Sequence, residues 1–497
     1  MVSPLPVIWR TATKDSPSID FGDIARQIRS ARKERHIPSL AVAVAKRGEI
    51  VWEDGFGWAN LETRLRSDPR IAYSLASISK PITATALMIL VERGLIDLDA
   101  PINEYLGDAK VTAHVGVAGN GQSGMDPREA ADQATVRRVA NHTSGLPLHY
   151  HFFHDDEPWR RPPMDLSILR YGHLVRLPGE RYVYANFGFG LIDYIIERAS
   201  GKPFGTFLKR EVLDPLGMTR SSLGIGTHLA PYTAERYDLE GRPISFYDFD
   251  HPGGSAVYAS ARDLVRFGQL HLKAPSNDQR AILSDASIEC MQTPTSDPDP
   301  DSGYGIGWRI ATDSRVYRTV SHDGSMGGVR TRLILVPEEQ LVVATVCNKR
   351  DELPVETANA IVAGYLPGFG AQEAPSDSDA LSFAAHPALL GRWRGSVQTY
   401  EGSIPVEMDI PDTGPIRVRF RDGLQTAVDA STFENDVLTG TTLGDIETED
   451  SAKRPYTLAF ELNLRWNVLN GSVTAVSEPG PRLGNALSHW CELEKAS

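Results

Sequence analysis

Two β-hairpin patterns that lie far apart in the chain constrain its fold most. The stretch "SLAVAVAKRGEIVWEDGFGWAN", which begins at Ser39, has two β-rich runs around the polar turn Lys46-Arg47-Gly48. The stretch "VRTRLILVPEEQLVVATVCNKR", which begins at Val329, repeats this design with its turn at Pro337 to Gln340. Two such hairpins can share one antiparallel sheet if the chain between them is a largely helical insertion. We therefore expect an α+β fold in which an antiparallel sheet is flanked by helices and accompanied by a helical subdomain.

The remaining segments differ in pattern. Apolar residues at helical spacing predict an amphipathic helix for "FGDIARQIRSARKERH", which begins at Phe21. Much Gly, Asp and Ala with little periodicity predicts that most of the region between Leu106 and Thr135 is a surface loop. The Ser-, Asp- and Pro-rich stretch 371–386 is typical of a linker. Beyond it, short, partly alternating runs such as "IPVEMDI" and "YTLAFEL" predict a small all-β barrel or sandwich. The predicted domains are thus 1–370, with a helical insertion at about 75–260, and 387–497.

Composition limits the classes of partner. The chain has 497 residues and a net charge of -13, which disfavours nucleic acid and anionic membrane surfaces as partners. The first 20 residues lack the basic start and apolar core of a secretory signal. No apolar run approaches the roughly 18 residues of a membrane span. We therefore expect a cytoplasmic protein without a membrane partner.

The stretch "YSLASISKPITATALMILVERG", which begins at Tyr73, contains the pattern Ser-x-x-Lys at Ser77 and Lys80. The same pattern at Ser30 and Lys33 falls inside the first predicted helix, where solvated surface explains it. Ser77 differs because it is expected at a helix N-terminus, where free N–H groups and the helix dipole favour a nucleophile and an oxyanion. A serine hydroxyl needs a base with a lowered pKa, and a buried lysine one turn later can serve.

Two further patterns carry polar side chains that suit catalysis. Tyr184 and Asn186 form the pattern Tyr-x-Asn in "LPGERYVYANFGFG", just before a predicted helix. A tyrosinate held by positive charge can act as a base. His322, Asp323 and Gly324 end a predicted strand, and the glycine would allow a substrate backbone to approach closely. Taken singly, the tyrosine is equally well an aromatic plug in a turn, and the histidine is better explained as structural.

In this order, Ser-x-x-Lys, Tyr-x-Asn and His-x-Gly resemble the motifs of the serine β-lactamase and penicillin-binding-protein superfamily. The likeness is to its class C β-lactamase-like branch, which includes D-aminopeptidases, DD-carboxypeptidases and esterases. The phrases "ANHTSGLP", "PLGMTRS", "YASARDLVRFGQ" and "YGIGW" agree with that branch, and the likeness spans about Phe21 to Pro367. The resemblance implies a serine hydrolase that acts on a small-molecule or peptide substrate through an acyl-enzyme, without a metal or an organic cofactor.

The resemblance also assigns roles to individual residues. It implies that Ser77 is the acylated nucleophile and that Lys80 accepts its proton or keeps Tyr184 poised. Tyr184 would be the general base and then the acid for the leaving group, and Asn186 would bind the acyl-side amide of the substrate. The backbone N–H groups of Ser77 and Ser325 would form the oxyanion hole. Whether Lys80 or Tyr184 takes the first proton stays open, because coupled groups share their titrations.

The third motif departs from the Lys-Thr-Gly of the β-lactamases. His322 carries less positive charge near pH 7 than lysine, and Asp323 adds a negative charge where Thr or Ser commonly helps to bind a carboxylate. We therefore expect a substrate without a free carboxylate beside the scissile bond: an ester, an amide or a peptide with a free D-amino end. The run "GRWRG", from Gly391, resembles the start of lipocalin-like barrels found behind some members of this branch. Such a domain can narrow the active site or mediate homo-oligomer formation, and the sequence leaves both open.

The sequence leaves several alternatives open. An acyltransferase or peptide cyclase would use the same catalytic residues, and a β-lactamase or DD-carboxypeptidase would differ only in substrate. A binding protein on the same fold would have lost its catalytic residues, whereas all are present here. A separate cluster has a spacing that suits zinc, although no further ligand is positioned by pattern and the resemblance calls for no metal. Its members are His149, His151, His154, Asp155 and Asp156.

Overall fold

A computed structural model of the chain describes residues 19–114, 126–295, 303–313, 317–366, 368–369, 386–478, 480 and 484–496. Their packing defines two compact units, which we name after their contents. The nucleophile unit comprises the described residues within Met1–Ile96, Ala199–Phe246 and Pro252–Ala374. The barrel unit comprises those within Asp97–Arg198, Tyr247–His251 and Pro375–Ser497. The predicted linker lies outside the described residues except for His386, and the predicted domain boundaries stay a prediction.

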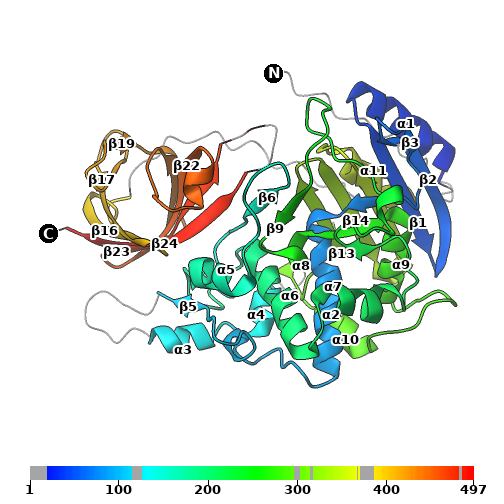
Figure 1. The fold of residues 1–497 in the computed structure, drawn as a ribbon, viewed down its shortest axis with the longest axis horizontal. Helices are drawn as coiled ribbons and strands as arrows, with labels where there is room; N and C mark the ends of the chain where they lie inside the picture. Colours follow the sequence, from blue (N-terminus) through cyan, green and yellow to red (C-terminus); the bar gives the residue numbers. More distant parts are fainter. Residues whose placement is uncertain are drawn as a thin grey trace. The chain divides into compact units, whose positions relative to one another are not determined.

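An eight-stranded sheet organises the nucleophile unit, as the two hairpins predicted (Figure 1). The two predicted hairpins meet in it, because Leu40 of β1 pairs with Cys347 of β15 in an antiparallel register. In spatial order the strands are β11 (Gly303–Tyr304), β12 (Arg309–Asp313), β13 (Tyr317–Met326), β14 (Val329–Val336), β15 (Leu341–Cys347), β1 (Ser39–Lys46), β2 (Glu49–Asn60) and β3 (Leu65–Arg66). The turn between β1 and β2 has positive φ at Arg47 and Gly48, which suits the right-handed twist of a tight hairpin.

Helices cover both faces of this sheet, which explains why β1 is apolar along almost its whole length. Its residues alternate between Val or Leu and Ala, and successive side chains point to opposite faces. Leu40, Val42 and Val44 pack in a core with α1 (Phe21–Glu34) and α11 (Leu353–Tyr365). On the other face lies α9 (Ala261–His271), where a Cβ on Gly268 would approach Val342 of β15 to 2.5 Å. The expected first helix is confirmed by α1.

The remaining elements of the nucleophile unit surround these layers. They are β4 (Ala72–Ser74), η1 (Ala76–Ile78), α2 (Ser79–Glu92), α7 (Phe204–Leu208), the π-helical turn η3 (Lys209–Leu213), β8 (Ser222–Leu223), η4 (Ala230–Tyr232), α8 (Pro252–Ser255), β10 (Val257–Ser260), α10 (Asp285–Met291) and η5 (Pro337–Glu339). Strands β4, β10 and β8 form a small antiparallel sheet in which Ser74 pairs with Tyr258. This sheet leads the chain directly into η1 and α2, the segment of the predicted nucleophile.

The barrel unit contains a helical segment that precedes and includes the Tyr-x-Asn pattern. Its elements are η2 (Ile102–Glu104), β5 (Thr112–Ala113), α3 (Pro127–Asp132), α4 (Val136–Ala140), β6 (Phe152–His154), α5 (Met164–Tyr171), β7 (His173–Leu174), α6 (Asn186–Ser200) and β9 (Tyr247–Phe249). The prediction of a surface loop up to Thr135 is wrong for α3. Asp126 caps that helix through the N–H of Arg128, and Pro127 stands at its first turn, where a missing N–H costs little. Residues 115–125 lie outside the described residues.

A nine-stranded antiparallel sheet that nearly closes into a barrel forms the other part of the barrel unit, as predicted. In spatial order its strands are β19 (Thr426–Ala427), β18 (Arg417–Phe420), β17 (Gly402–Ile410), β16 (Gly391–Thr399), β24 (Ala486–Lys495), β23 (Val468–Ser477), β22 (Tyr456–Arg465), β21 (Val437–Thr442) and β20 (Asp429–Glu434). Its two ends approach each other, because the Thr426 hydroxyl on β19 lies 2.8 Å from that of Thr442 on β21. The short helical turn η6 (Ser451–Lys453) precedes β22.

Buried polar contacts join the helical segment to this barrel. The carboxylate of Asp450 accepts hydrogen bonds from Arg170 at 2.9 Å and from Tyr171 at 2.8 Å, both of which belong to α5. Lys453 donates to the same carboxylate at 2.6 Å. Burial alone would raise the pKa of Asp450, but the surrounding charge and hydrogen bonds lower it below its usual range. A carboxylate satisfied in this way stabilises the attachment only while it is ionised.

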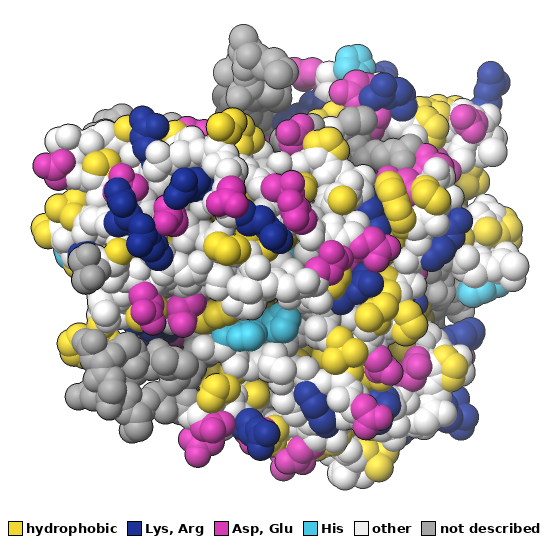
Figure 2. Space-filling model, turned by 60° about the vertical axis from the view of Figure 1, so that its left-hand side comes forward, with side chains coloured by type: hydrophobic (Ala, Val, Ile, Leu, Met, Phe, Trp, Pro, Cys, Tyr) yellow, Lys and Arg dark blue, Asp and Glu magenta, His cyan; other side chains and the backbone are white. Residues whose placement is uncertain are grey.

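Two surface observations bear on partners. On the face of Figure 2, basic and acidic side chains of the described residues are interspersed rather than gathered by sign. Among the helices that the structure describes, none combines the length and apolar character needed to cross a membrane.

Candidate active site

Ser77 lies in η1, two residues before α2 begins at Ser79 and three residues after the buried strand β4 ends at Ser74. It is the one partly exposed residue between Ile71 and Leu90. The preceding residue, Ala76, has φ +49, a conformation that residues with a side chain rarely adopt. Leu75 anchors this sharp turn from both sides: its N–H donates to Val257 at 2.9 Å, and its carbonyl accepts from Thr331 Oγ1 at 2.9 Å. The fold thus presents a single hydroxyl of this segment to solvent on a fixed backbone.

Lys80 supplies an amine to that hydroxyl. Its Nζ lies 3.1 Å from Ser77 Oγ and 3.1 Å from the carbonyl oxygen of Gly254. The side chain is completely buried, and burial, followed by the charge of Arg309, lowers the pKa of Lys80 well below its ordinary value. A lowered pKa raises the fraction of neutral amine at pH 7, and only the neutral amine can accept the serine proton. The contact and the lowered pKa therefore make the Lys80 amine able to accept a proton from Ser77.

The third motif lies on β13, beside the turn that carries Ser77. A Cβ on Gly324 would lie 2.0 Å from the carbonyl oxygen of Leu75 and 2.3 Å from Thr331 Oγ1. Only glycine allows this strand to approach the turn so closely. Ser325 follows at the next position, and its side chain is exposed. The close approach explains why the motif needs a glycine independently of any substrate.

His322 is buried in the same strand and has a hydrogen-bond partner at each ring nitrogen. Nε2 lies 2.8 Å from the hydroxyl of Tyr304, and Nδ1 lies 2.7 Å from the backbone oxygen of Asp323. Burial, followed by the charges of Lys80 and Arg309, lowers the pKa of His322 well below its ordinary value. The ring is therefore neutral near pH 7, which agrees with the expectation that it carries less charge than a lysine.

Asp323 points to the opposite face of the strand, where two arginines compensate the negative charge that we expected it to add. Arg332 Nη1 lies 2.6 Å from its carboxylate, and Arg330 Nη2 lies 3.7 Å away. Both arginines come from the neighbouring strand β14, where Arg332 stands directly opposite Asp323 in the register. The sequence pattern showed the acid but not the cross-strand arginines that compensate it.

Tyr184 and Asn186 belong to the barrel unit. Tyr184 is partly exposed and lies just before α6, of which Asn186 is the first residue. The ring of Tyr184 lies 4.4 Å from the ring of His142, centroid to centroid. His142 itself is fixed to this segment, because its Nδ1 accepts a hydrogen bond from the N–H of Ala185 at 3.2 Å and its carbonyl accepts one from Val183 at 2.9 Å. The structure thus places the predicted tyrosine on a hydrogen-bonded support.

The predicted site residues therefore fall into two groups. The nucleophile unit brings together Ser77, Lys80, His322, Gly324 and Ser325. The barrel unit holds Tyr184 and Asn186. The assigned roles of all seven residues remain proposals.

The histidine-rich stretch is part of the barrel unit's interior. His149 Nε2 lies 2.8 Å from the carboxylate of Asp250, and the N–H of His151 donates to the same carboxylate at 3.1 Å. Burial lowers the pKa of His151 to about 3. The ring of His154 packs against that of Tyr247. Within the ranges that the structure describes, no three His, Cys, Asp or Glu side chains are grouped as a metal site would require.

Sequence reasoning missed several contributors to the site. Tyr304, Thr331, Arg309 and the carbonyl of Gly254 were not singled out, although Tyr304 and Arg309 lie in or beside the phrase "YGIGW". In that phrase, a Cβ on Gly307 would approach Ala84 of α2 to 2.6 Å. The glycine at position 307, which allows this stretch to pack closely on α2, was the sequence signal that could have placed Tyr304 and Arg309 near Ser77.

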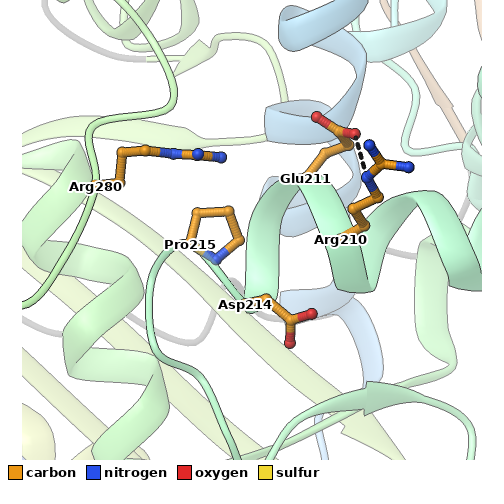
Figure 3. Close-up of a pocket in the computed structure, with 5 residues that line it drawn as sticks. All are labelled: Arg210, Glu211, Asp214, Pro215 and Arg280. Atoms are coloured by element: carbon orange, nitrogen blue, oxygen red, sulfur yellow. Dashed lines mark ion pairs between the residues drawn. The ribbon is translucent and has the colours of Figure 1, made fainter.

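A separate hollow in the nucleophile unit, of about 460 Å³, has no nucleophile among its lining residues (Figure 3). It is lined by Arg210, Glu211, Asp214, Pro215 and Arg280. Arg210 Nε pairs with Glu211 at 3.5 Å, and Asp214 points away from this pair in Figure 3. Two acidic side chains, Glu211 and Asp214, line the hollow together with the two arginines, and their negative charge makes it a poor anion site.

Comparisons with known proteins agree with this geometry. The Beta-lactamase family matches residues 24–365. Penicillin-binding protein 4* of Bacillus subtilis (strain 168) is 24% identical over 398 residues, which cover 74% of this chain and 81% of that protein. The fold is similar to that of a class C β-lactamase, with a TM-score of 0.57 and 18% identity over 69% of this chain and 95% of that one. It is also similar to that of SurE with D-Leu, with a TM-score of 0.60 and 18% identity over 96% of this chain and 99% of that one.

The family match covers the eight-stranded sheet and all the predicted site residues. Members of the β-lactamase and penicillin-binding-protein superfamily are serine hydrolases that act on small-molecule or peptide substrates. The chain belongs to the β-lactamase family, within the superfamily that includes the penicillin-binding proteins.

Proposed function

We propose that this protein cleaves an ester or an amide through an acyl-enzyme on Ser77, with D-amino-acid peptides or amides as its amide substrates. The observation that carries the proposal is the contact between the buried amine of Lys80 and the partly exposed hydroxyl of Ser77, at 3.1 Å. This is the pairing of a nucleophile with a base of lowered pKa that acyl transfer from a serine requires.

The proposed reaction proceeds in two halves. Lys80 takes the proton of Ser77 as Oγ attacks the carbonyl carbon, and the N–H groups of Ser77 and Ser325 stabilise the negative oxygen. Tyr184 donates a proton to the leaving alcohol or amine, and Asn186 binds the acyl-side amide. A water molecule then attacks the acyl-enzyme, and the proton transfers run in reverse to free Ser77.

Two observations support the substrate class. A neutral His322 offers no charge to a carboxylate beside the scissile bond, unlike the lysine of the β-lactamases. The relative in complex with D-Leu shares the fold over almost the whole chain, which supports a D-amino-acid group in the substrate. Arg309 is an exposed cation close enough to lower the pKa values of Lys80 and His322. Because an exposed arginine can bind a carboxylate, the test includes substrates that carry one.

A substrate panel tests the proposal. Short-chain aryl esters and D-aminoacyl anilides are expected to be turned over, and L-aminoacyl anilides and a cephalosporin much less. Ser77→Ala should abolish all turnover, whereas Ser74→Ala should retain it because the buried Ser74 hydroxyl has no hydrogen-bond partner among the described residues. Turnover that survives in Ser77→Ala contradicts the proposal, and efficient cephalosporin hydrolysis that depends on Ser77 contradicts its substrate class.

The same panel separates hydrolysis from acyl transfer. Adding a D-amino ester as a competing nucleophile should leave the hydrolysis product dominant. A dominant amide product would identify an acyltransferase or peptide cyclase that uses the same acyl-enzyme.

A further inference from the structure

Tyr304 and His322 form a hydrogen bond inside the nucleophile unit, beside the proposed base. Tyr304 lies on β11 and is 1% exposed, and His322 on β13 is equally buried. The hydroxyl of Tyr304 lies 2.8 Å from Nε2 of the imidazole. The other ring nitrogen, Nδ1, lies 2.7 Å from the backbone oxygen of Asp323.

These two contacts define where the proton on the imidazole resides. A backbone carbonyl oxygen can only accept a hydrogen bond, so Nδ1 must carry a hydrogen and donate it to Asp323. A neutral imidazole has one N–H, which leaves Nε2 as an acceptor for the hydroxyl of Tyr304. The neutral tautomer with hydrogen on Nδ1 is therefore the one in which both contacts are favourable.

The groups around the ring disfavour its second proton. Arg309 on β12 and Arg332 on β14 act on His322 as cations, and Lys80 on α2 does so whenever its amine is protonated, whereas the backbone oxygen of Asp323 favours the charged ring. Tyr304, on β11, contributes a neutral hydroxyl. A protonated ring would thus be buried among positive charges, which costs free energy.

We propose that Tyr304 is a positioning residue that holds His322 as the neutral Nδ1–H tautomer, so that the imidazole neither takes the Ser77 proton nor adds charge beside Lys80. The catalytic consequence rests on the proposed function, in which the Lys80 amine is the base. In this arrangement the third motif keeps the family's strand geometry and replaces a lysine's fixed charge with an uncharged ring. It also separates this chain from serine–histidine hydrolases, in which the imidazole itself takes the serine proton.

Nitrogen NMR tests the tautomer directly. The protein is labelled with ¹⁵N-histidine, and the signals of His322 among the 13 histidines are assigned by their loss in His322→Gln. Wild-type protein should show a protonated Nδ1 and an unprotonated Nε2 from about pH 5 to 8, the range in which an ordinary histidine titrates. A protonated Nε2, or a ring that titrates in this range, would overturn the proposal.

The variant Tyr304→Phe tests the role of the hydroxyl. Its His322 should titrate at a higher pH than in the wild type, with a midpoint closer to the ordinary value of about 6.5. The control Tyr73→Phe removes a buried hydroxyl that contacts Ser39 and Ser67, and it should leave the His322 signals unchanged. Unchanged signals in Tyr304→Phe would overturn the proposal. Should that variant fail to fold, the wild-type spectrum still decides the tautomer.

Kinetics connects the tautomer to catalysis. At pH values below the new pKa of His322, the acylation rate of Tyr304→Phe should be about tenfold lower than that of the wild type. In this range the protonated ring of His322 is an added cation that lowers the proton affinity of the Lys80 amine. The wild-type profile should show the ionisation of Lys80 but none of His322, and an identical profile in the variant would contradict the proposed role. These outcomes are distinct from failure of the proposed function, which would appear as turnover that persists in Ser77→Ala whatever the nitrogen spectrum shows.

Discussion

Replacing Lys80 with methionine is the perturbation that bears most directly on the chemistry. Methionine has nearly the volume of lysine and no amine, so Lys80→Met removes the contact with Ser77 Oγ at 3.1 Å and leaves the packing largely intact. The hydroxyl of Ser77 stays in place because the turn is held through Leu75, which contacts Val257 and Thr331.

The expected magnitude follows from the loss of the proposed general base. Positioned bases contribute about 10²–10⁴-fold to the rate, which corresponds to about 3–5 kcal/mol of activation free energy. Lys80→Met should therefore lower the acylation rate constant by about 10³-fold at pH 8. Wild-type acylation should rise with pH through the lowered pKa of Lys80, as the amine loses its proton, and this rise should be absent in the variant.

Stopped-flow acylation with an aryl ester measures this effect, and chemical denaturation checks the fold. The pKa of Lys80 is lower in the folded than in the unfolded state, so the unfolded chain binds more protons between the two pKa values. Burying this amine therefore costs stability at neutral pH, a cost that falls as the pH rises towards the unfolded pKa. Lys80→Met should consequently be more stable than the wild type by about 1 kcal/mol at pH 7.

The result that refutes this reasoning is a folded Lys80→Met protein whose acylation rate lies within about threefold of the wild-type rate. Loss of a general base lowers the rate by far more than that. A fast variant that keeps the wild-type pH profile would show that another group takes the serine proton.

Three further predictions concern other parts of the molecule. Tyr184→Phe should lower the rate of leaving-group departure from an anilide by about 10²-fold while aryl esters, with better leaving groups, suffer less; steady-state kinetics on both substrates checks this difference. Gly324→Ala should lower the melting temperature and abolish acylation, because the new Cβ would lie 2.0 Å from the carbonyl oxygen of Leu75; overpacking of this kind costs about 1–3 kcal/mol, measurable by thermal denaturation. Asp450→Asn should destabilise the protein by about 3 kcal/mol at pH 7, because Arg170 and Lys453 lose their buried counter-charge. Since the pKa of Asp450 is lowered in the folded state, this contribution is present above the unfolded pKa of about 4 and is lost as the pH falls, so the stabilities of variant and wild type should converge in acid denaturation curves.

The sequence predicted the elements whose patterns are strong and local. The β-rich runs on either side of a polar turn predicted the hairpins of β1–β2 and β14–β15, and their shared sheet followed from interpreting the chain between them as a largely helical insertion. Helix α1 followed from its amphipathic spacing. The nine-stranded sheet followed from short alternating runs broken by turn residues.

Features that depend on distant partners could not be predicted in this way. The charge of Asp323 is compensated by Arg330 and Arg332, whose position opposite it depends on the register of two strands. The tautomer of His322 depends on Tyr304, which lies 18 positions away along the chain and two strands away in the sheet. Helix α3 was missed because it is short and its capping residue, Asp126, stands in a stretch without periodicity.

The roles of Ser77 and Lys80 were inferred from motif resemblance, and the structure supplied the contact and the burial that the chemistry needs. Those quantities were beyond sequence reasoning because the pKa of Lys80 depends on complete burial and on Arg309, which lies far along the chain.

Mass spectrometry after labelling with a fluorophosphonate tests the central claim most directly. We predict one adduct per chain, on the peptide that contains Ser77, with no adduct in Ser77→Ala and full labelling in Ser74→Ala. An adduct on another residue, or labelling of Ser77→Ala at the wild-type rate, would contradict the account.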